Sequence, residues 1–274
     1  MVSSVADPLT AGVHTVEVED VVLRYHVHGT GPLCVAHPGG PGFAWDYLRA
    51  PVLEKQLTMV YVEPVGTGGS DRLTGHPHGG FVAQYHALHR PDQLAGIVLY
   101  DSAPVTGGEH AAEVMCSVRE FATRHTGHPE LPSVLEAFAA IPSIGDDEAM
   151  LAAARGVLPA YIADYWADPQ RWAPLRQSLR ATYISGLDEH GVPDVVDDRE
   201  PLRTLSVPAL VVAGRYDVVC GVRWAEELHK LIPASRLVIL EHSGHFGHLE
   251  EPERFADEVP AFVTADNAST YGNA

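Results

Sequence analysis

The sequence predicts an α/β protein with a doubly wound, mostly parallel sheet and an inserted helical cap. Short continuous apolar runs alternate with helical patterns near both ends of the chain, which is typical of parallel strands that are covered on both faces. The middle of the chain, residues 105–200, breaks this alternation because it contains helical patterns only. We therefore expect a sheet built from both ends of the chain, with the middle folded over it as a cap.

The elements follow from local patterns. Residues 16–27 alternate apolar and polar side chains with a break near Glu19 and Asp20, which predicts an antiparallel hairpin with one buried face. Five apolar runs bounded by turn residues are the expected parallel strands: Leu33–Ala36, Thr58–Val62, 96–100, 209–213 and 236–240. The helical patterns between them cover 44–55, 81–89, 222–231 and 252–263. Those of the cap cover 109–124, 132–140, 147–166 and 171–183.

These patterns divide the chain into four parts. Residues 1–104 are expected to form the N-terminal half of the core, 105–200 the cap and 201–266 the C-terminal half. The small polar residues 267–274 are expected to be a frayed, disordered tail.

Composition excludes several classes of protein. Eighteen Lys and Arg against thirty-six Asp and Glu give a formal net charge of -18, which repels nucleic acids and anionic membranes. The apolar runs are far shorter than the roughly 18 residues of a membrane helix, and no signal pattern is present, so a soluble cytoplasmic protein is expected. Cys34, Cys116 and Cys220 lack CxxC spacing, and we expect small core residues without a disulfide or zinc site.

A glycine-rich segment follows the strand Leu33–Ala36 directly and reads HPGGPG over residues 37–42. Glycines there let backbone N–H groups approach a reacting carbonyl group, and one such N–H can form half of an oxyanion hole. Because Pro41 has no N–H, Gly39, Gly40 or Gly42 must supply the donor. A tight turn would explain one of these glycines, but the whole cluster favours a functional loop.

From this loop onward the chain resembles the α/β-hydrolases, and within them the proline iminopeptidase-like branch with its HGGPG-type loop. The resemblance continues through residues 63–72 (EPVGTGGSDR), 79–104, the cap and 207–252. It implies hydrolysis of amide or ester bonds in a small molecule or short peptide by a serine, a histidine and an acid. That reaction requires only side chains and water, so no cofactor is expected.

Two members of such a triad are present. Asp217 follows the strand 209–213 within the segment GRYD, and the resemblance makes it the acid that orients the histidine. A helix cap or surface position is the alternative for this residue. His245 follows the last strand and would be the general base. His242 and His248 are interpreted as solvated neighbours, and no metal site is expected because no matched carboxylate or cysteine ligands lie near them in the sequence.

The nucleophile of the triad is absent from the sequence. The family places its serine in a G-x-S-x-G elbow with a strained backbone, but residues 75–80 read GHPHGG, so Pro77 occupies the serine position. Proline has no nucleophilic side chain, and its ring fixes φ near about -65°, whereas the elbow requires a positive φ. No other serine or cysteine has small residues two positions before and after it.

The segment around Pro77 is also too short for the family's fold. Only residues 63–80 separate the strand Thr58–Val62 from the next helical pattern, and they cannot hold both a crossover helix and a buried strand. We predict that one central strand, between Leu33–Ala36 and 96–100, is missing together with its preceding helix. A deletion joining a GHPHG loop to a GHSHGG elbow would explain both features. The neighbouring strands would then either pair directly or keep unpaired edges.

Several other residues have two interpretations. Ser102 is either a turn serine or a group that approaches the site, and Asp101 is either a cap or a second acid beside His245. Trp45, Trp166, Trp172 and Tyr161 either line a pocket or pack in the core. The acidic cap residues either hold a cationic amine or face water; they include Glu109, Glu113, Glu120, Asp146, Asp147, Glu148 and Asp164.

Three hypotheses about function remain. The first is an impaired hydrolase without its nucleophile. The second is a non-catalytic pseudo-hydrolase that binds a small apolar or cationic ligand. The third is a deletion product with no stable role.

Overall fold

The computed structural model describes residues 7–18, 21–40, 42–64, 67, 79–187, 190, 192 and 195–270, of which 266–270 are described by their backbone only. The predictions concerning Pro77 and Pro41 lie outside these residues.

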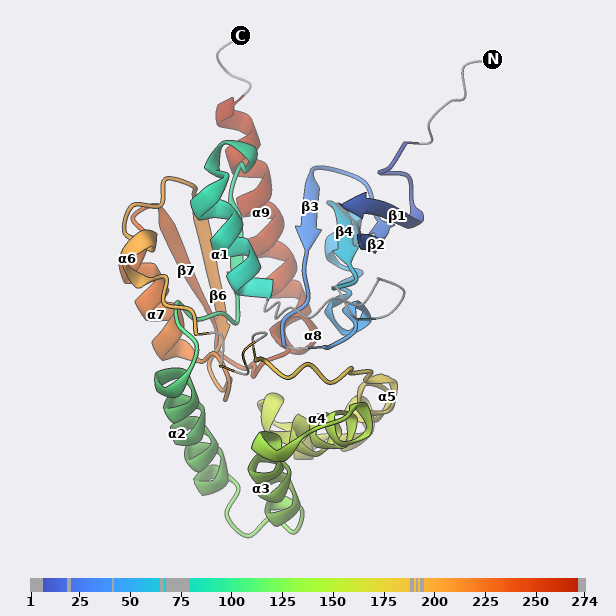
Figure 1. Ribbon diagram of the computed structural model, residues 1–274, viewed down its shortest axis with the longest axis vertical. Coiled ribbons are helices and arrows are strands. Elements are labelled where there is room, and N and C mark those ends of the chain that lie inside the picture. Colours follow the sequence, from blue (N-terminus) through green and yellow to red (C-terminus); the bar gives the residue numbers. More distant parts are fainter. Residues whose placement is uncertain are drawn as a thin grey trace.

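The described strands form two separate sheets (Figure 1). The first has the order β1-β2-β4-β3 and contains β1 (Gly12–Val18), β2 (Val21–His28), β4 (Thr58–Val62) and β3 (Leu33–Ala36). The second has the order β5-β6-β7, with β5 (Ile97–Tyr100), β6 (Ala209–Gly214) and β7 (Ser235–Leu240). β2 pairs antiparallel with β1 and β4, and the other three pairings are parallel. The predicted mostly parallel α/β architecture is confirmed.

Both sheets end at the place where the sequence predicts a missing strand. Helix α1 (Gly79–His89) begins with two consecutive glycines. These glycines lie against the residues that follow β3 and β5. A Cβ on Gly79 would lie 2.3 Å from the carbonyl oxygen of His37, which follows β3, and a Cβ on Gly80 would lie 2.1 Å from Oγ of Ser102, which follows β5. Among the described residues, β3 and β5 have one strand partner each. β3 and β5 do not pair with each other, so each described sheet has an edge there.

Burial differs between the strands as this arrangement requires. Every residue of β6 is buried, whereas every second residue of β5 is only partly buried. On β3, Leu33 is 51% exposed and Val35 is 61% exposed. Strands in the middle of a parallel α/β sheet are normally covered on both faces. The exposed side chains of β3 therefore mark a face that no described helix covers.

Helix α9 (Pro252–Thr270) joins the two sheets. Its Phe255 and Val259 share one buried cluster with Met59 and Tyr61 of β4 and with residues of β6 and β7. The opposite face of the second sheet is covered by α1, α6 (Arg199–Leu202) and α7 (Val222–Leu231). A shared apolar core on one face thus connects sheets that have no described strand pairing between them.

The cap lies at the lower end of Figure 1. It comprises α2 (Gly108–Arg124), α3 (Leu131–Ala140), α4 (Asp147–Tyr161), α5 (Pro169–Ser178) and the short 3-10 segments η4 (Ile141–Ser143) and η5 (Tyr165–Ala167). Asp146 and Asp168 begin α4 and α5 by accepting hydrogen bonds from the N–H groups of Ala149 and Arg171, which is the usual role of an N-cap aspartate.

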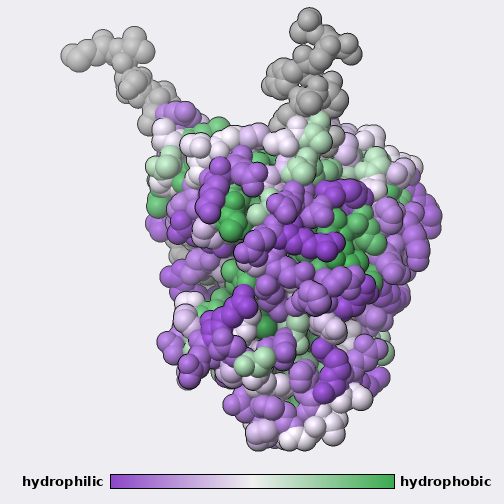
Figure 2. Space-filling view, turned by 180° about the vertical axis from the view of Figure 1, so that it is seen from behind, coloured by the Kyte–Doolittle hydropathy of each residue, from purple (hydrophilic) through white to green (hydrophobic). Residues whose placement is uncertain are grey.

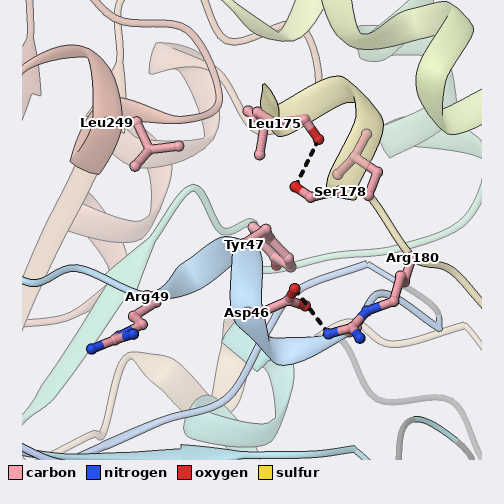
Figure 3. A pocket seen from close by; sticks show the side chains of 9 residues that line it. Asp46, Tyr47, Arg49, Leu175, Ser178, Arg180 and Leu249 are labelled. Carbon is pink, nitrogen blue, oxygen red and sulfur yellow. Dashed lines mark hydrogen bonds and ion pairs between the residues drawn. The ribbon is translucent and has the colours of Figure 1, made fainter. Parts of the chain in front are cut away.

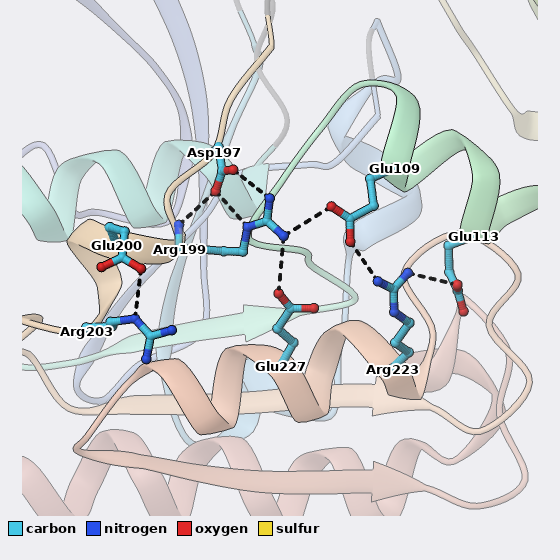
Figure 4. Close-up of polar contacts among 8 residues, drawn as sticks. All are labelled: Glu109, Glu113, Asp197, Arg199, Glu200, Arg203, Arg223 and Glu227. Carbon is cyan, nitrogen blue, oxygen red and sulfur yellow. Dashed lines mark hydrogen bonds and ion pairs between the residues drawn. The ribbon is translucent and has the colours of Figure 1, made fainter.

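The two chain segments that connect the cap to the core run side by side. Thr106 donates its N–H to the carbonyl group of Val196, and Asp198 donates to that of Pro104. Close to this junction, Arg199 pairs with Asp197 and Glu109, and Arg223 of α7 pairs with Glu109 and Glu113 of α2 (Figure 4). Because Glu109 bonds both guanidinium groups, it ties the first turn of the cap to α6 and α7.

Some local predictions were wrong. Residues 44–55 form two 3-10 segments, η1 (Trp45–Leu48) and η2 (Leu53–Lys55), instead of one helix, because Pro51 has no N–H to donate within a helix. Another 3-10 segment, η3 (Pro91–Gln93), follows α1. The pattern at 171–183 ends at Ser178, since the chain becomes extended at Leu179 and pairs with the glycine loop at Thr182.

The hairpin, one cysteine and the tail also differ from expectation. The hairpin forms in the predicted place, but Val13, Val16 and Val18 are exposed because β1 is an edge strand that nothing covers. Cys116 is exposed on α2 and is not a core residue. Helix α9 continues to Thr270, beyond the expected end of the core at residue 266, since extending an existing helix costs little per residue.

The face seen in Figure 2 is mainly hydrophilic, with separate hydrophobic areas. Within the part of the chain that the structure describes, every helix is too short or too polar to cross a membrane.

Candidate active site

Asp217 and His245 form a hydrogen-bonded pair. Asp217 follows β6 and His245 follows β7, so adjacent parallel strands place them at the same edge of the sheet. His245 Nδ1 lies 3.0 Å from Asp217 Oδ2, and Asp217 Oδ1 accepts a 2.7 Å hydrogen bond from the N–H of Val219. The Asp217 side chain is fully buried. The pair fixes Nδ1 as the nitrogen that faces the carboxylate, which leaves Nε2 to exchange protons.

The charges of this pair stabilise each other. Burial favours a neutral Asp217 and raises its pKa, but the imidazole charge and hydrogen bonds of His245 and the N–H of Val219 outweigh that effect and leave the pKa below its usual value. For His245, burial lowers the pKa, whereas Asp217 raises it above the ordinary value of 6.5. The site therefore favours an imidazolium held against a carboxylate, as a general base requires after it takes a proton.

Asp101 supplies a second carboxylate on the same side of the imidazole ring. It directly follows β5 and has a φ of 45°, a left-handed conformation that is uncommon for residues other than glycine. Its Oδ1 accepts a 3.3 Å hydrogen bond from the N–H of Gly214, and its Oδ2 lies 3.9 Å from His245 Nδ1. That Oδ2 is buried and has no hydrogen-bond partner among the described residues.

Burial raises the pKa of Asp101 well above its usual range, and the nearby charge of Asp217 raises it further. Two carboxylates so close to each other cannot both ionise cheaply. The site therefore favours the neutral form of Asp101 and the charged form of Asp217, which faces His245. This arrangement agrees with the interpretation of Asp101 as a second acid group.

Asp101, Asp217 and His245 have ligand-type atoms within 4.8 Å of one another, which satisfies the geometry of a cation site. The sequence argument against a metal was incomplete, because the fold brings carboxylates to His245 that are distant in sequence. Three of the four carboxylate oxygens already accept N–H groups, from Val219, Gly214 and His245. Hydrogen bonds thus account for most of the cluster without an ion.

The glycine loop is tied to its surroundings by two contacts. Gly39 donates its N–H to the hydroxyl group of Tyr47 at 2.8 Å. The carbonyl group of Gly42 accepts a hydrogen bond from Thr182, and a Cβ on Gly42 would lie 1.7 Å from the carbonyl oxygen of Thr182. Gly40 has a φ of 72°. Because the N–H of Gly39 is occupied, Gly40 or Gly42 is the better candidate for an oxyanion donor.

Tyr47 connects this loop to the segment that carries His245. Its carbonyl oxygen lies 2.9 Å from His248 Nε2, and its ring contacts the ring of Phe246 edge to face. His248 is only 2% exposed, so the prediction that it is a solvated neighbour was wrong. The segment after β7 turns into α8 (Gly247–Glu250), which brings His248 inward. His242 is exposed, as predicted.

The remaining candidates have mainly packing roles. Tyr161 contacts the His245 ring edge to face, with ring centroids 5.1 Å apart. Trp45 stacks on His26, and Trp166 stacks on His128. Trp172 is buried in an apolar cluster of the cap. Of the four aromatic residues considered as a pocket lining, Tyr161 alone contacts the histidine among the described ring pairs.

Ser102 is 6% exposed, and its Oγ accepts a 3.2 Å hydrogen bond from Gln84 Nε2. That contact assigns it to the anchoring of α1 beside β5. The acidic cap residues Glu109 and Glu113 are engaged by arginines, as described above, and Asp146 caps a helix.

Two pockets lie beside the site. The smaller, about 150 Å³, separates η1 from α5 and is bordered by an ion pair between Asp46 and Arg180 (Figure 3). The larger, about 620 Å³, lies between α2 and the loop that carries Asp217. Charged and aromatic side chains line it, including Glu120, Arg119, Arg124, Arg215, Tyr216 and Arg223.

A buried carboxylate–imidazole pair at the edge of a parallel sheet, next to a glycine loop and under a helical cap, defines a hydrolase-type fold and site. A profile of the alpha/beta hydrolase family matches residues 5–258. The chain belongs to the alpha/beta hydrolase family.

Curated relatives have diverse activities. The chain is 28% identical to a pimeloyl-[acyl-carrier protein] methyl ester esterase of Vibrio vulnificus, with 88% of this chain and 98% of that protein covered. It is 24% identical to a proline iminopeptidase of Saccharolobus solfataricus, with 87% of each chain covered. A solved hydrolase of Pseudomonas aeruginosa has a TM-score of 0.65 at 23% identity, with 92% of this chain and 98% of that chain covered, and supports the fold.

The Asp217–His245 pair gives a direct prediction. In an Asp217→Asn variant the pKa of His245 should fall below 6.5, because burial lowers it and the main opposing charge is gone. An NMR titration of the imidazole measures this pKa. Asp101→Asn is the matched control and should leave the His245 pKa above 6.5, since the carboxylates that raise this pKa are Asp217 and Glu250. An unchanged pKa in Asp217→Asn would show that the pair does not form in solution.

Proposed function

We propose that this chain is a hydrolase-fold protein of proline iminopeptidase-like ancestry. Its general base and its acid are assembled, but it has no nucleophile that could attack a substrate. The observation that carries the proposal is the 3.0 Å contact between His245 Nδ1 and Asp217 Oδ2, combined with a proline at the sequence position of the serine. In an intact site, serine would attack an ester or amide carbonyl, His245 would transfer the proton and Asp217 would hold the imidazole.

Three observations support the loss of a segment. β3 and β5 remain edge strands within the described part of the chain, with only two glycines between the groups that follow them. β3 exposes two large apolar side chains. The alignment with the proline iminopeptidase extends over 284 positions, more than the 274 residues of this chain, so that relative contains residues without a counterpart here.

The proposal predicts no covalent catalysis. A fluorophosphonate probe should not label the purified chain, and hydrolysis of aminoacyl or short-chain acyl esters should equal that of a His245→Ala variant. Without a nucleophile, His245 has no hydroxyl group to activate. Mass spectrometry and a chromogenic ester assay provide the two measurements. Turnover that scales with protein and disappears in His245→Ala would contradict the proposal, as would a probe adduct on any serine.

The 620 Å³ pocket favours a second candidate function, the binding of a small molecule without reaction. Its volume lies in the range of small-molecule sites. Its lining includes arginine and glutamate side chains, and the ligand expected from the sequence is a small apolar or cationic molecule. A thermal-shift screen distinguishes the two functions, since a raised melting temperature without probe labelling supports binding alone.

A further inference from the structure

The carboxylate of Glu250 contacts the backbone next to His245. Glu250 ends α8, and its Oε2 accepts a 2.8 Å hydrogen bond from the N–H of Gly244. The N–H of Phe246 faces the same carboxylate and lowers its pKa. The backbone on both sides of His245 therefore lies against one side chain.

The same carboxylate reaches the cap. Glu250 Oε1 accepts a 2.7 Å hydrogen bond from the N–H of Ala163, two residues beyond the end of α4. A second contact runs in parallel, because His245 donates its own N–H to the carbonyl group of Tyr161 at 2.7 Å. The loop that carries the imidazole thus has two hydrogen bonds to one short segment of the cap.

Close packing enforces this junction. A Cβ on Gly244 would lie 2.4 Å from the carbonyl oxygen of Tyr161, so only glycine permits the approach without a shift of the backbone. Tyr161 also places its ring against the imidazole. A displacement of the end of α4 would consequently be transmitted to both the backbone and the ring of His245.

We propose that Glu250 is a positioning residue that couples the end of cap helix α4 to the orientation of His245. The importance of this coupling for proton transfer rests on the proposed function, whereas the coupling itself does not. In a chain with an intact nucleophile, closure of the cap on a substrate would set the imidazole through the N–H groups of Ala163 and Gly244, which both bond Glu250.

Glu251 provides a matched control. It is the next residue and also accepts two hydrogen bonds, from the N–H of His242 at 2.8 Å and from Oγ of Ser243 at 2.6 Å. Those donors precede Gly244, and neither belongs to the cap. Glu251→Gln therefore perturbs the same loop to a similar extent without breaking the connection between Ala163 and Gly244.

The test is amide hydrogen exchange of the full chain, combined with the NMR signals of the His245 imidazole. Glu250 accepts these two hydrogen bonds on two different oxygens, whereas the glutamine of Glu250→Gln has only one acceptor oxygen and a donating NH2 group in place of the other. Exchange of the Ala163 and Gly244 amides should accelerate together by about tenfold or more, and the His245 imidazole resonances should shift. Glu251→Gln should leave the Ala163 amide and the imidazole resonances unchanged.

Unchanged exchange and imidazole signals in a folded Glu250→Gln variant would overturn the proposal, and so would an equal effect of Glu251→Gln. Glu250→Asp shortens the side chain while keeping the charge, and it should accelerate exchange at Ala163 more than at Gly244, because Gly244 is closer in sequence. None of these readouts requires turnover. Failure of the coupling can therefore be distinguished from failure of the proposed function.

Discussion

Replacement of residues 68–78 by a crossover helix, a strand and a G-x-S-x-G elbow should give a chain that reacts covalently with a fluorophosphonate probe. The acid, the base and the glycine loop are already present around the position where the elbow would end, beside Gly79 and Gly80. Under the proposed function, the component that the insert has to supply is a serine in a strained turn that presents its hydroxyl group to Nε2 of His245. The corresponding segment of a proline iminopeptidase is a suitable insert.

The insertion should also stabilise the fold. β3 and β5 each contribute four residues with one unpaired side among the described strands. The inserted strand would pair these N–H and C=O groups, and a hydrogen bond contributes about 0.5–1.5 kcal/mol net, so the free energy of unfolding should rise by a few kcal/mol. Denaturant titration measures this gain.

The same insert with alanine in place of the elbow serine is the control. It should be stabilised to the same extent as the serine version, but it should not react with the probe. An insert that neither stabilises the chain nor becomes labelled would show that β3 and β5 are not separated by one strand.

Acidification from pH 6.5 to pH 4 should destabilise the protein through His248. This side chain is 2% exposed, and burial lowers its pKa to about 4 from 6.5. Between these values the unfolded chain binds a proton that the folded chain does not, so the free energy of unfolding falls as the pH falls. The difference corresponds to about 3 kcal/mol at full effect.

His248→Gln isolates this contribution, because glutamine does not titrate but can still donate to the carbonyl group of Tyr47 and accept from the Tyr100 hydroxyl group. Relative to the wild type, the variant should gain stability as the pH falls from 6.5 to 4, as measured by urea unfolding at several pH values.

Glu250 should have the opposite effect on the pH dependence of the free energy of unfolding. Burial raises its pKa to about 7, and the charge of Asp217 contributes to this. Asp101, His245 and the Tyr100 hydroxyl group are the other titratable groups near it. The folded chain keeps a proton that the unfolded chain has lost, so stability falls as the pH rises from 4.5 to 7. Relative to the wild type, Glu250→Gln should gain stability over that rise. If the stability of His248→Gln or Glu250→Gln varied with pH in parallel with that of the wild type, the pKa assigned to the replaced residue would be contradicted.

Much of the fold could be predicted from local sequence patterns. β3, β4 and α7 begin and end where their patterns do, because apolar runs bounded by turn residues leave few alternatives. Residues 44–55 could not be read from periodicity alone, since their apolar spacing suits a helix that Pro51 interrupts. The exposure of β1 and β3 depends on which other elements pack against them. That is a property of the tertiary structure and not of the local sequence pattern.

Single sequence motifs predicted only part of the site. Asp217 and His245 are identified by the strands they follow, and the structure places them in contact. Asp101 was considered only as one of two possibilities, because its proximity to His245 depends on the order of β5, β6 and β7. Glu250 was missed entirely. Its sequence position is that of an ordinary acidic residue on a short helix, and only the folded chain shows that N–H groups from Ala163, Gly244 and Phe246 converge on it.

Within the part of the chain that the structure describes, β3 and β5 have open edges, which has a consequence in concentrated solution. An uncovered strand edge with apolar neighbours is a template for pairing with another molecule, and Leu33 and Val35 lie on such an edge. The formal charge of -18 opposes this encounter between identical molecules at neutral pH. Mutual repulsion therefore protects against self-association, and this protection weakens in strong salt or as the carboxylates become protonated.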